Sequence, residues 1–175
     1  MKKLLVVVDY QNDFVTGALE NPAARKLEDG IAAKVTEYEQ SGGYVLFTRD
    51  THPENYLQTR EGMFLPVPHC VRGTDGWHLY GKLAAYENGV HPNVMVVDKP
   101  TFGSAALPGQ VLTLCGGAPD EIALCGVVTD ICAIVLHSHF LNAPVTIHRS
   151  LCAAATEENH ERALSVLAGM GYNIV

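Results

Sequence analysis

Short apolar runs recur along the whole chain and are separated by segments with a different pattern. The longer runs cover residues 2–8, 44–50, 93–99, 121–127 and 144–150, and a short last one covers 172–175. Most of these runs are apolar without the strict alternation of a half-exposed strand. Such runs are typical of strands that are buried on both faces of a parallel sheet.

The segments between the runs carry helical signals. Between the first two runs, Ile31, Val35 and Tyr38 recur at a spacing that places them on one face of a helix. Before the last run, Thr156 is suited to cap a helix whose first turn carries two glutamates. The alternation of strands and helices predicts an α/β fold, a three-layer α/β/α sandwich with one mostly parallel sheet of about six strands. We expect residues 1–175 to form a single domain.

Charge and composition exclude several classes of partner. Twelve Lys and Arg stand against nineteen Asp and Glu, giving a net charge of -7, and no basic run stands out. Nucleic acid and membrane are therefore not expected as partners, and no apolar run has the length to span a bilayer. The five cysteines are odd in number and scattered, which does not suit a disulfide framework. We expect a cytoplasmic protein.

Chemically useful side chains follow the predicted strands. Asp9 comes after the first strand, Asp50 and His52 after the second, and Lys99 after the third. Cys132 follows the fourth, near the start of a helix expected from about residue 129 to 141, where backbone N–H groups and the helix dipole favour a thiolate. Open α/β sheets place their sites at this edge. Each residue alone has an ordinary structural explanation, but an acid, a base and a thiol at one edge suggest catalysis.

Several motifs resemble those of the isochorismatase-like cysteine hydrolases, and within them the nicotinamidases. The segment VVVDYQNDF is similar to the opening strand and D-x-Q-N-D-F motif of that family, DKPTFGSA to its lysine motif, and CGVVTDICA to its nucleophile segment. RDTH and PHCVRGTDG resemble the metal motifs of the nicotinamidase branch. The motifs follow the family's order over nearly the whole chain.

The resemblance implies a catalytic triad. Cys132 would be the nucleophile, Asp9 the general base, and Lys99 the residue that orients Asp9 and stabilises the thiolate. It also implies a cis peptide between Val127 and Val128, with the backbone N–H groups of Val128 and Cys132 forming the oxyanion hole. The implied reaction converts nicotinamide to nicotinate and ammonia through a thioester.

A metal site is the second implication. Asp50 and His52 alternate on an extended segment and can point to one side, and His69 follows in a proline-rich loop. These residue types suit one divalent ion of Zn, Mn or Fe. Glu61 stands at a suitable spacing for a further ligand, and Glu54 is the less favoured choice. In the family the metal binds the pyridine nitrogen of the substrate and thereby orients it.

The substrate pocket departs from the family pattern. Many nicotinamidases have a tryptophan shortly before the second metal histidine, where this chain has Leu65 or Val67, and the single tryptophan, Trp77, comes later. Phe14 and Phe102 are candidates for aromatic walls, and Leu65 is the third expected pocket residue.

Three hypotheses for function remain open from sequence alone. The leading one is a metal-dependent nicotinamidase, which would serve NAD salvage. The second is a cysteine amidase that acts on another small amide or carbamoyl compound. The third is a catalytically silent binding or scaffold member, against which the intact Asp9, Lys99 and Cys132 argue. Family resemblance also implies a homo-oligomer.

Overall fold

The structure is a computed structural model that describes residues 1–130 and 142–175. The helix expected from about residue 129 and the predicted nucleophile Cys132 therefore fall almost wholly outside the described residues. Thr129, near the expected start of that helix, is described and is buried.

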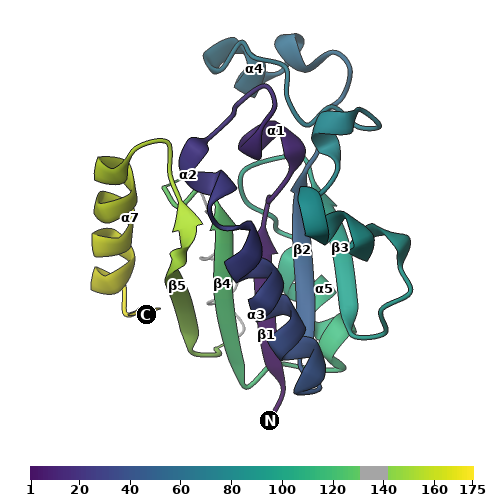
Figure 1. Cartoon of the computed structure of the whole chain (residues 1–175), viewed down its shortest axis with the longest axis vertical. Helices are drawn as coiled ribbons and strands as arrows, with labels where there is room; N and C mark the ends of the chain where they lie inside the picture. The colour runs from purple at the N-terminus through teal and green to yellow at the C-terminus, as the bar shows by residue number, and fades with distance from the viewer. Residues whose placement is uncertain (131–141) are drawn as a thin grey trace.

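The described strands form one six-stranded sheet (Figure 1). They are β1 (Lys3–Val8), β2 (Tyr44–Asp50), β3 (Val94–Lys99), β4 (Glu121–Val127), β5 (Val145–Ala153) and β6 (Asn173–Ile174). Every neighbouring pair of these strands is parallel, in the order β3-β2-β1-β4-β5-β6. The prediction of a mostly parallel α/β sheet is thus confirmed, and each apolar run corresponds to a strand.

Helices cover both faces of this sheet. Helix α3 (Glu28–Gln40) buries Ile31, Val35 and Tyr38 against one face, as its spacing predicts. Helix α5 (Leu107–Cys115) packs on the opposite face together with Leu164 of α7 (Glu157–Gly169). Figure 1 shows α3 in front of the strands and α5 behind them. The sandwich has the three layers expected for this class of fold.

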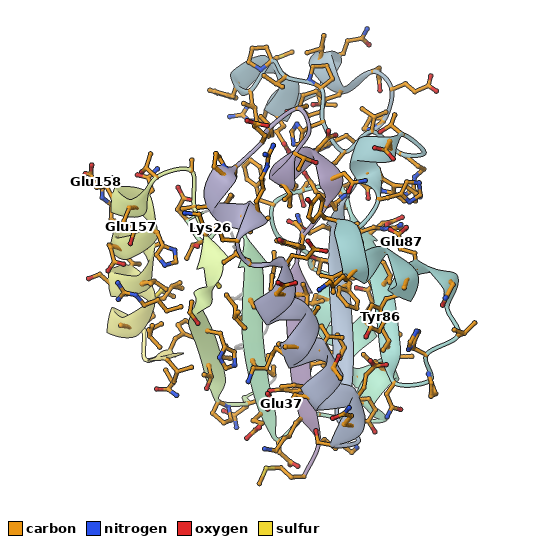
Figure 2. The ribbon with its side chains drawn as sticks, viewed as in Figure 1. Lys26, Glu37, Tyr86, Glu87, Glu157 and Glu158 are labelled. Carbon is orange, nitrogen blue, oxygen red and sulfur yellow. The ribbon has the colours of Figure 1, made fainter. Side chains whose placement is uncertain are left out.

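The start of α7 agrees with its sequence signals. The side chain of Thr156 accepts a hydrogen bond from the backbone N–H of Asn159 at 3.2 Å, which is the geometry of an N-cap. Glu157 and Glu158 lie in the first turn (Figure 2), where negative charge is favourable near the helix dipole.

Short helical segments lie in the connections between these longer elements. They are α1 (Asn12–Val15), α2 (Pro22–Arg25), α4 (Arg60–Phe64) and the 3₁₀ helices η1 (Tyr56–Gln58), η2 (Asp75–Trp77) and η3 (Gly81–Asn88). Within residues 1–130 and 142–175, no helix combines the length and apolar character needed to cross a bilayer.

The strand order fixes where a site can form. The order reverses between β1 and β4, and open α/β sheets bind ligands in the crevice at such a reversal. Asp9 follows β1 directly, and Val127 ends β4. On the other side of β1, the register pairs Asp50 of β2 with Lys99 of β3. The topology therefore brings these strand ends to one edge.

Candidate active site and metal centre

Asp9 and Lys99 form a buried ion pair at the reversal point. The Nζ of Lys99 lies 2.7 Å from Oδ2 of Asp9, and Lys99 is only 2% exposed. Asp9 turns out of the strand with φ 47, and its other oxygen, Oδ1, accepts a hydrogen bond from the Thr48 hydroxyl at 2.7 Å. Backbone and side-chain contacts thus hold the carboxylate in one orientation.

The surroundings of Asp9 change its acidity. Burial raises the pKa of Asp9 above the ordinary value of 3.8, while the positive charge of Lys99 opposes that rise. A carboxyl group with a raised pKa accepts and returns a proton more readily near neutral pH than an ordinary aspartate does. This property suits a general base that later acts as an acid.

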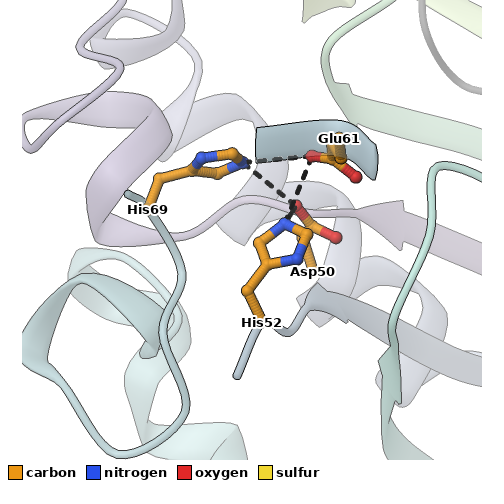
Figure 3. A group of neighbouring side chains, drawn as sticks. All are labelled: Asp50, His52, Glu61 and His69. Atoms are coloured by element: carbon orange, nitrogen blue, oxygen red, sulfur yellow. Dashed lines mark hydrogen bonds and ion pairs between the residues drawn. The ribbon is translucent and has the colours of Figure 1, made fainter. Parts of the chain in front are cut away.

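Four potential metal ligands converge beside this pair (Figure 3). They are Asp50, His52, Glu61 and His69, and one donor atom from each lies within 4.8 Å of all the others. Oδ2 of Asp50 is 2.9 Å from Nε2 of His52 and 3.4 Å from Nε2 of His69. Oε1 of Glu61 is 3.3 Å and 3.7 Å from the same two nitrogens. Glu54 is exposed and does not belong to this group.

The chemistry of this group fits a divalent cation. Among the described residues, Oδ1 of Asp50 and Oε1 of Glu61 are buried and have no hydrogen-bond partner. Buried carboxylate oxygens are costly unless a cation compensates them, and the contacts these two do make are at ion-pair distances: 3.5 Å from Lys99 Nζ to Oδ1 of Asp50, and 3.3 Å from His52 Nε2 to Oε1 of Glu61. The Nδ1–H of His69 donates to the Val67 carbonyl at 2.8 Å, which leaves the Nε2 lone pair directed into the group. Two imidazoles and two carboxylates suit Zn, Mn or Fe.

The acidity of Asp50 agrees with ligand chemistry. Burial alone would raise its pKa, but hydrogen bonds with His52 and His69 and the charge of Lys99 outweigh burial and lower the pKa. The carboxylate therefore stays ionised, as a metal ligand must. Lys99 Nζ lies 3.5 Å from Oδ1 of Asp50, so this one lysine faces both Asp9 and the metal group.

A pocket opens over both groups of residues. Its volume is about 390 Å³, and its walls include Asp9, Asp50, His69 and Lys99. The three residues expected to line a substrate pocket, Phe14, Leu65 and Phe102, all border it. The peptide between Val127 and Val128 is cis, and both of these residues also line the pocket. The position of Cys132 lies outside the described residues.

Trp77 and Val67 do not line this pocket. The indole Nε1–H of Trp77 donates to the Thr51 hydroxyl at 2.8 Å, and the guanidinium of Arg49 lies 3.7 Å from the ring centre. Trp77 thus supports the segment that carries two of the metal-type donors, and of the two residues near the expected tryptophan position only Leu65 lines the pocket.

Sequence reasoning missed some pocket residues, among them Asn21. Its Oδ1 caps α2 by accepting from the backbone N–H of Ala23 at 2.9 Å, and its Nδ2 donates to the Ala154 carbonyl at 2.8 Å. An asparagine just before Pro22 is a recognisable helix-start signal. That signal predicts the cap, but it does not predict that the cap borders a pocket.

Comparisons with known proteins agree with this geometry. The chain is 34% identical over 175 residues to the uncharacterized isochorismatase family protein PncA of Bacillus subtilis (strain 168), covering 96% of this chain and 95% of that protein. The crystal structure of nicotinamidase/pyrazinamidase PncA from Bacillus subtilis superposes with a TM-score of 0.88 at 29% identity, covering 100% of both chains. A Pyrococcus horikoshii pyrazinamidase in complex with zinc gives a TM-score of 0.83 at 26% identity, covering 100% of this chain and 99% of that chain.

The isochorismatase domain model matches residues 3–175, which is almost the entire chain. Together with the identity to the Bacillus subtilis protein over the same length, this match shows that the chain belongs to the isochorismatase family.

Proposed function

We propose that this protein is a metal-dependent cysteine amidohydrolase that converts nicotinamide to nicotinate and ammonia. The observation that carries the proposal is the buried pair of Asp9 and Lys99 beside four converging metal donors, two of which, Asp50 and His69, line the same pocket as the pair. Structural neighbours named nicotinamidase/pyrazinamidase, and a pyrazinamidase in complex with zinc, support the same activity.

In the proposed reaction Asp9 takes the proton of the Cys132 thiol. The thiolate attacks the amide carbonyl carbon, forming a C–S bond, and the backbone N–H groups of Val128 and Cys132 stabilise the oxyanion. The C–N bond then breaks, and Asp9 returns its proton to the departing ammonia. Water hydrolyses the thioester, which releases the acid and restores the thiol.

Lys99 and the metal ligands have distinct parts in this proposal. Lys99 neutralises Asp9 and favours the thiolate form of Cys132. Asp50, His52, Glu61 and His69 would hold one divalent ion, which when bound supplies a Lewis acid able to bind a ring nitrogen and so orient the amide. The side chains of Phe14, Leu65 and Phe102 would enclose the ring.

The test measures ammonia release from nicotinamide by the purified protein, with and without a chelator, beside Cys132→Ala. We expect release by the wild-type protein, loss of release with the chelator, and loss in Cys132→Ala. Near-native turnover in Cys132→Ala would contradict the nucleophile assignment, and turnover that resists metal removal would contradict the role of the ion.

The absence of a tryptophan at the position of Leu65 or Val67 favours a second candidate. Without a tryptophan at this place the pocket has less aromatic surface for a pyridine ring, so a cysteine amidase for another small amide or carbamoyl compound is the alternative. Covalent labelling of Cys132 at neutral pH without release of ammonia from nicotinamide would favour that alternative, and an unreactive Cys132 would favour a silent scaffold.

The biological setting forms part of the proposal. We infer a cytoplasmic enzyme of NAD salvage that self-associates, supported by the odd number of scattered cysteines and by the family to which the chain belongs. Light scattering of the purified protein would measure its oligomeric state directly.

A further inference from the structure

The side chain of Gln11 makes the hydrogen bonds to Asp50 that a longer β1 would otherwise make. Strand β1 ends at Val8, whereas β2 continues to Asp50, so the last residue of β2 has no β1 peptide to pair with. The Gln11 carboxamide fills that place: its Oε1 accepts from the Asp50 N–H at 2.7 Å, and its Nε2 donates to the Asp50 carbonyl at 2.9 Å. Both backbone groups of Asp50 are therefore held by one amide.

The same amide is fixed from a second direction. Nε2 of Gln11 also donates to the Trp77 carbonyl at 2.7 Å, and Gln11 is fully buried. A buried amide with three hydrogen bonds has a single orientation, since a rotated amide would place its nitrogen against the Asp50 N–H and its oxygen against two carbonyls. The backbone that carries the Asp50 carboxylate is correspondingly fixed.

Asp13 holds the backbone next to His69, as Gln11 holds the backbone of Asp50. Its Oδ2 accepts from the backbone N–H of Cys70 at 2.7 Å, and its Oδ1 accepts from the N–H of Ala18 at 3.0 Å. Cys70 follows His69 directly and has φ 45, a conformation uncommon for a residue with a side chain. The charge-assisted hydrogen bond that the Cys70 N–H donates to Asp13 holds this unfavourable turn in place.

We propose that Gln11 and Asp13 are positioning residues of the metal centre, which hold Asp50 and His69 in the places where their donor atoms converge. The inference rests on the metal site described above. Asp9, Gln11 and Asp13 lie within one short stretch at the end of β1 and the start of α1, so one segment aligns the proposed general base with two proposed ligands. Residues that orient metal ligands typically change metal affinity by about 10- to 100-fold when they are replaced.

The experiment measures zinc affinity of the metal-stripped full chain by competition with a chromogenic chelator. Gln11→Met keeps an unbranched side chain but removes the amide, and Asp13→Asn keeps the shape but can no longer accept from both N–H groups. Asn12→Ala is the matched control, because Asn12 lies between the two in the sequence and, among the described residues, its side chain donates to the Asp75 carbonyl alone, at 2.8 Å.

We expect zinc to bind Gln11→Met and Asp13→Asn about 10- to 100-fold more weakly than the wild-type chain, and Asn12→Ala to stay within about threefold. The weaker zinc binding of Asp13→Asn should persist at raised ionic strength. Salt screens the long-range attraction between Asp13 and zinc, but it does not restore the orientation of His69. Melting temperatures of the metal-free variants show whether each one folds.

A merely structural role for these residues predicts lower melting temperatures with an unchanged zinc dissociation constant in the folded protein, and that result would overturn the inference. If one variant does not fold, the other decides in the same way. Absence of zinc binding by the wild-type chain would instead overturn the metal site itself, and with it the inference.

Discussion

At the scale of single residues, conformation and burial decide what the charged side chains can do. Asp9 leaves β1 in a left-handed conformation with φ 47, which points its carboxylate toward Lys99. Asparagine tolerates this conformation at least as well as aspartate, so Asp9→Asn preserves the turn while it removes the proton acceptor. The residue thus offers a clean test of general base catalysis.

We expect Asp9→Asn to release ammonia from nicotinamide at least about 100-fold more slowly than the wild-type protein, the usual range for loss of a general base. Glu20→Gln is the control, because Glu20 also borders the pocket but pairs with Arg25 at 2.9 Å on the surface. A comparable loss in both variants would point to a general effect of charge in the pocket.

Glu61 is the ligand candidate that the sequence predicts least firmly, because its spacing from the other ligands is suitable but not distinctive. It lies on α4, a separate five-residue helix, and its Oε1 is buried without a hydrogen-bond partner among the described residues. Glu61→Gln should weaken zinc binding by about 100-fold or more, since even residues that only support ligands cost about 10- to 100-fold. Equilibrium dialysis measures this, with Glu54→Gln as the exposed control; equal affinity in the two variants would remove Glu61 from the ligand set.

Sequence reasoning locates strand-end residues well and loop residues less well. Asp9, Asp50 and Lys99 each follow an apolar run, and a parallel sheet brings such positions to one edge whatever the loops do. The place of Glu61 depends on how η1 and α4 fold back over the sheet, and no periodicity in the sequence encodes that. The role of Gln11 is hidden for a similar reason, because its partners are distant in the chain.

At the scale of elements, the region 51–92 is a long connection between β2 and β3 that carries three of the four metal-type donors. It contains α4 and three short 3₁₀ helices, which are too short for the sequence to predict by periodicity. Such short helices are stabilised by tertiary contacts more than by local propensity. The contacts of Glu87 illustrate this dependence.

Glu87 joins η3 to β2 and to the chain before η3 (Figure 2). Its Oε1 accepts from Nη1 of Arg49 at 2.7 Å and from the Leu79 N–H at 3.0 Å, and its Oε2 lies 2.7 Å from Nδ1 of His78. Burial favours a higher pKa for Glu87, but these hydrogen bonds outweigh it and hold the pKa below the ordinary value of 4.5. The folded state therefore favours the ionised form.

A lowered carboxyl pKa contributes stability that is fully present above pH 4.5, the ordinary value for the unfolded chain, and that is lost as the pH falls through the lower folded pKa. Glu87→Gln should thus reduce the free energy of unfolding by about 1–3 kcal/mol at pH 7, and by much less at a pH below the folded value. Urea denaturation at both pH values measures the difference. Glu158→Gln is the control, because Glu158 forms an exposed pair with Arg162, and it should change the free energy of unfolding little at either pH. An equal effect of Glu87→Gln at both pH values would contradict the view that the ionised form of Glu87 stabilises the fold.

At the scale of the whole molecule, the class of fold follows from the sequence but the strand order does not. Apolar runs identify buried strands, yet nothing within a run such as 121–127 states that it lies beside the first strand of the chain. That order arises from the handed crossover connections, which place β2 and β4 on opposite sides of β1. The crevice at this reversal is then a product of topology.

The proposed ligands come from separate segments, so metal binding should stabilise the molecule as a whole. A ligand that binds only the folded state adds about 2.7 kcal/mol when its concentration is about 100 times its dissociation constant. For a chain of 175 residues this raises the melting temperature by about 5–10 °C. Calorimetry of metal-stripped protein with added zinc measures the shift; His52→Ala should abolish most of it, and an equal shift in that variant would place the zinc elsewhere.

The register of β2 and β3 ties the two halves of the site to one another. Asp50, a proposed ligand, and Lys99, a member of the proposed triad, are direct partners across that pair of strands. Suppose that one of these strands is replaced by its counterpart from a relative with different metal ligands. Asp50 or Lys99 would then face a partner residue with which it does not form the same site. Hybrid enzymes built within this family should therefore keep the region from β2 to β3 from a single parent.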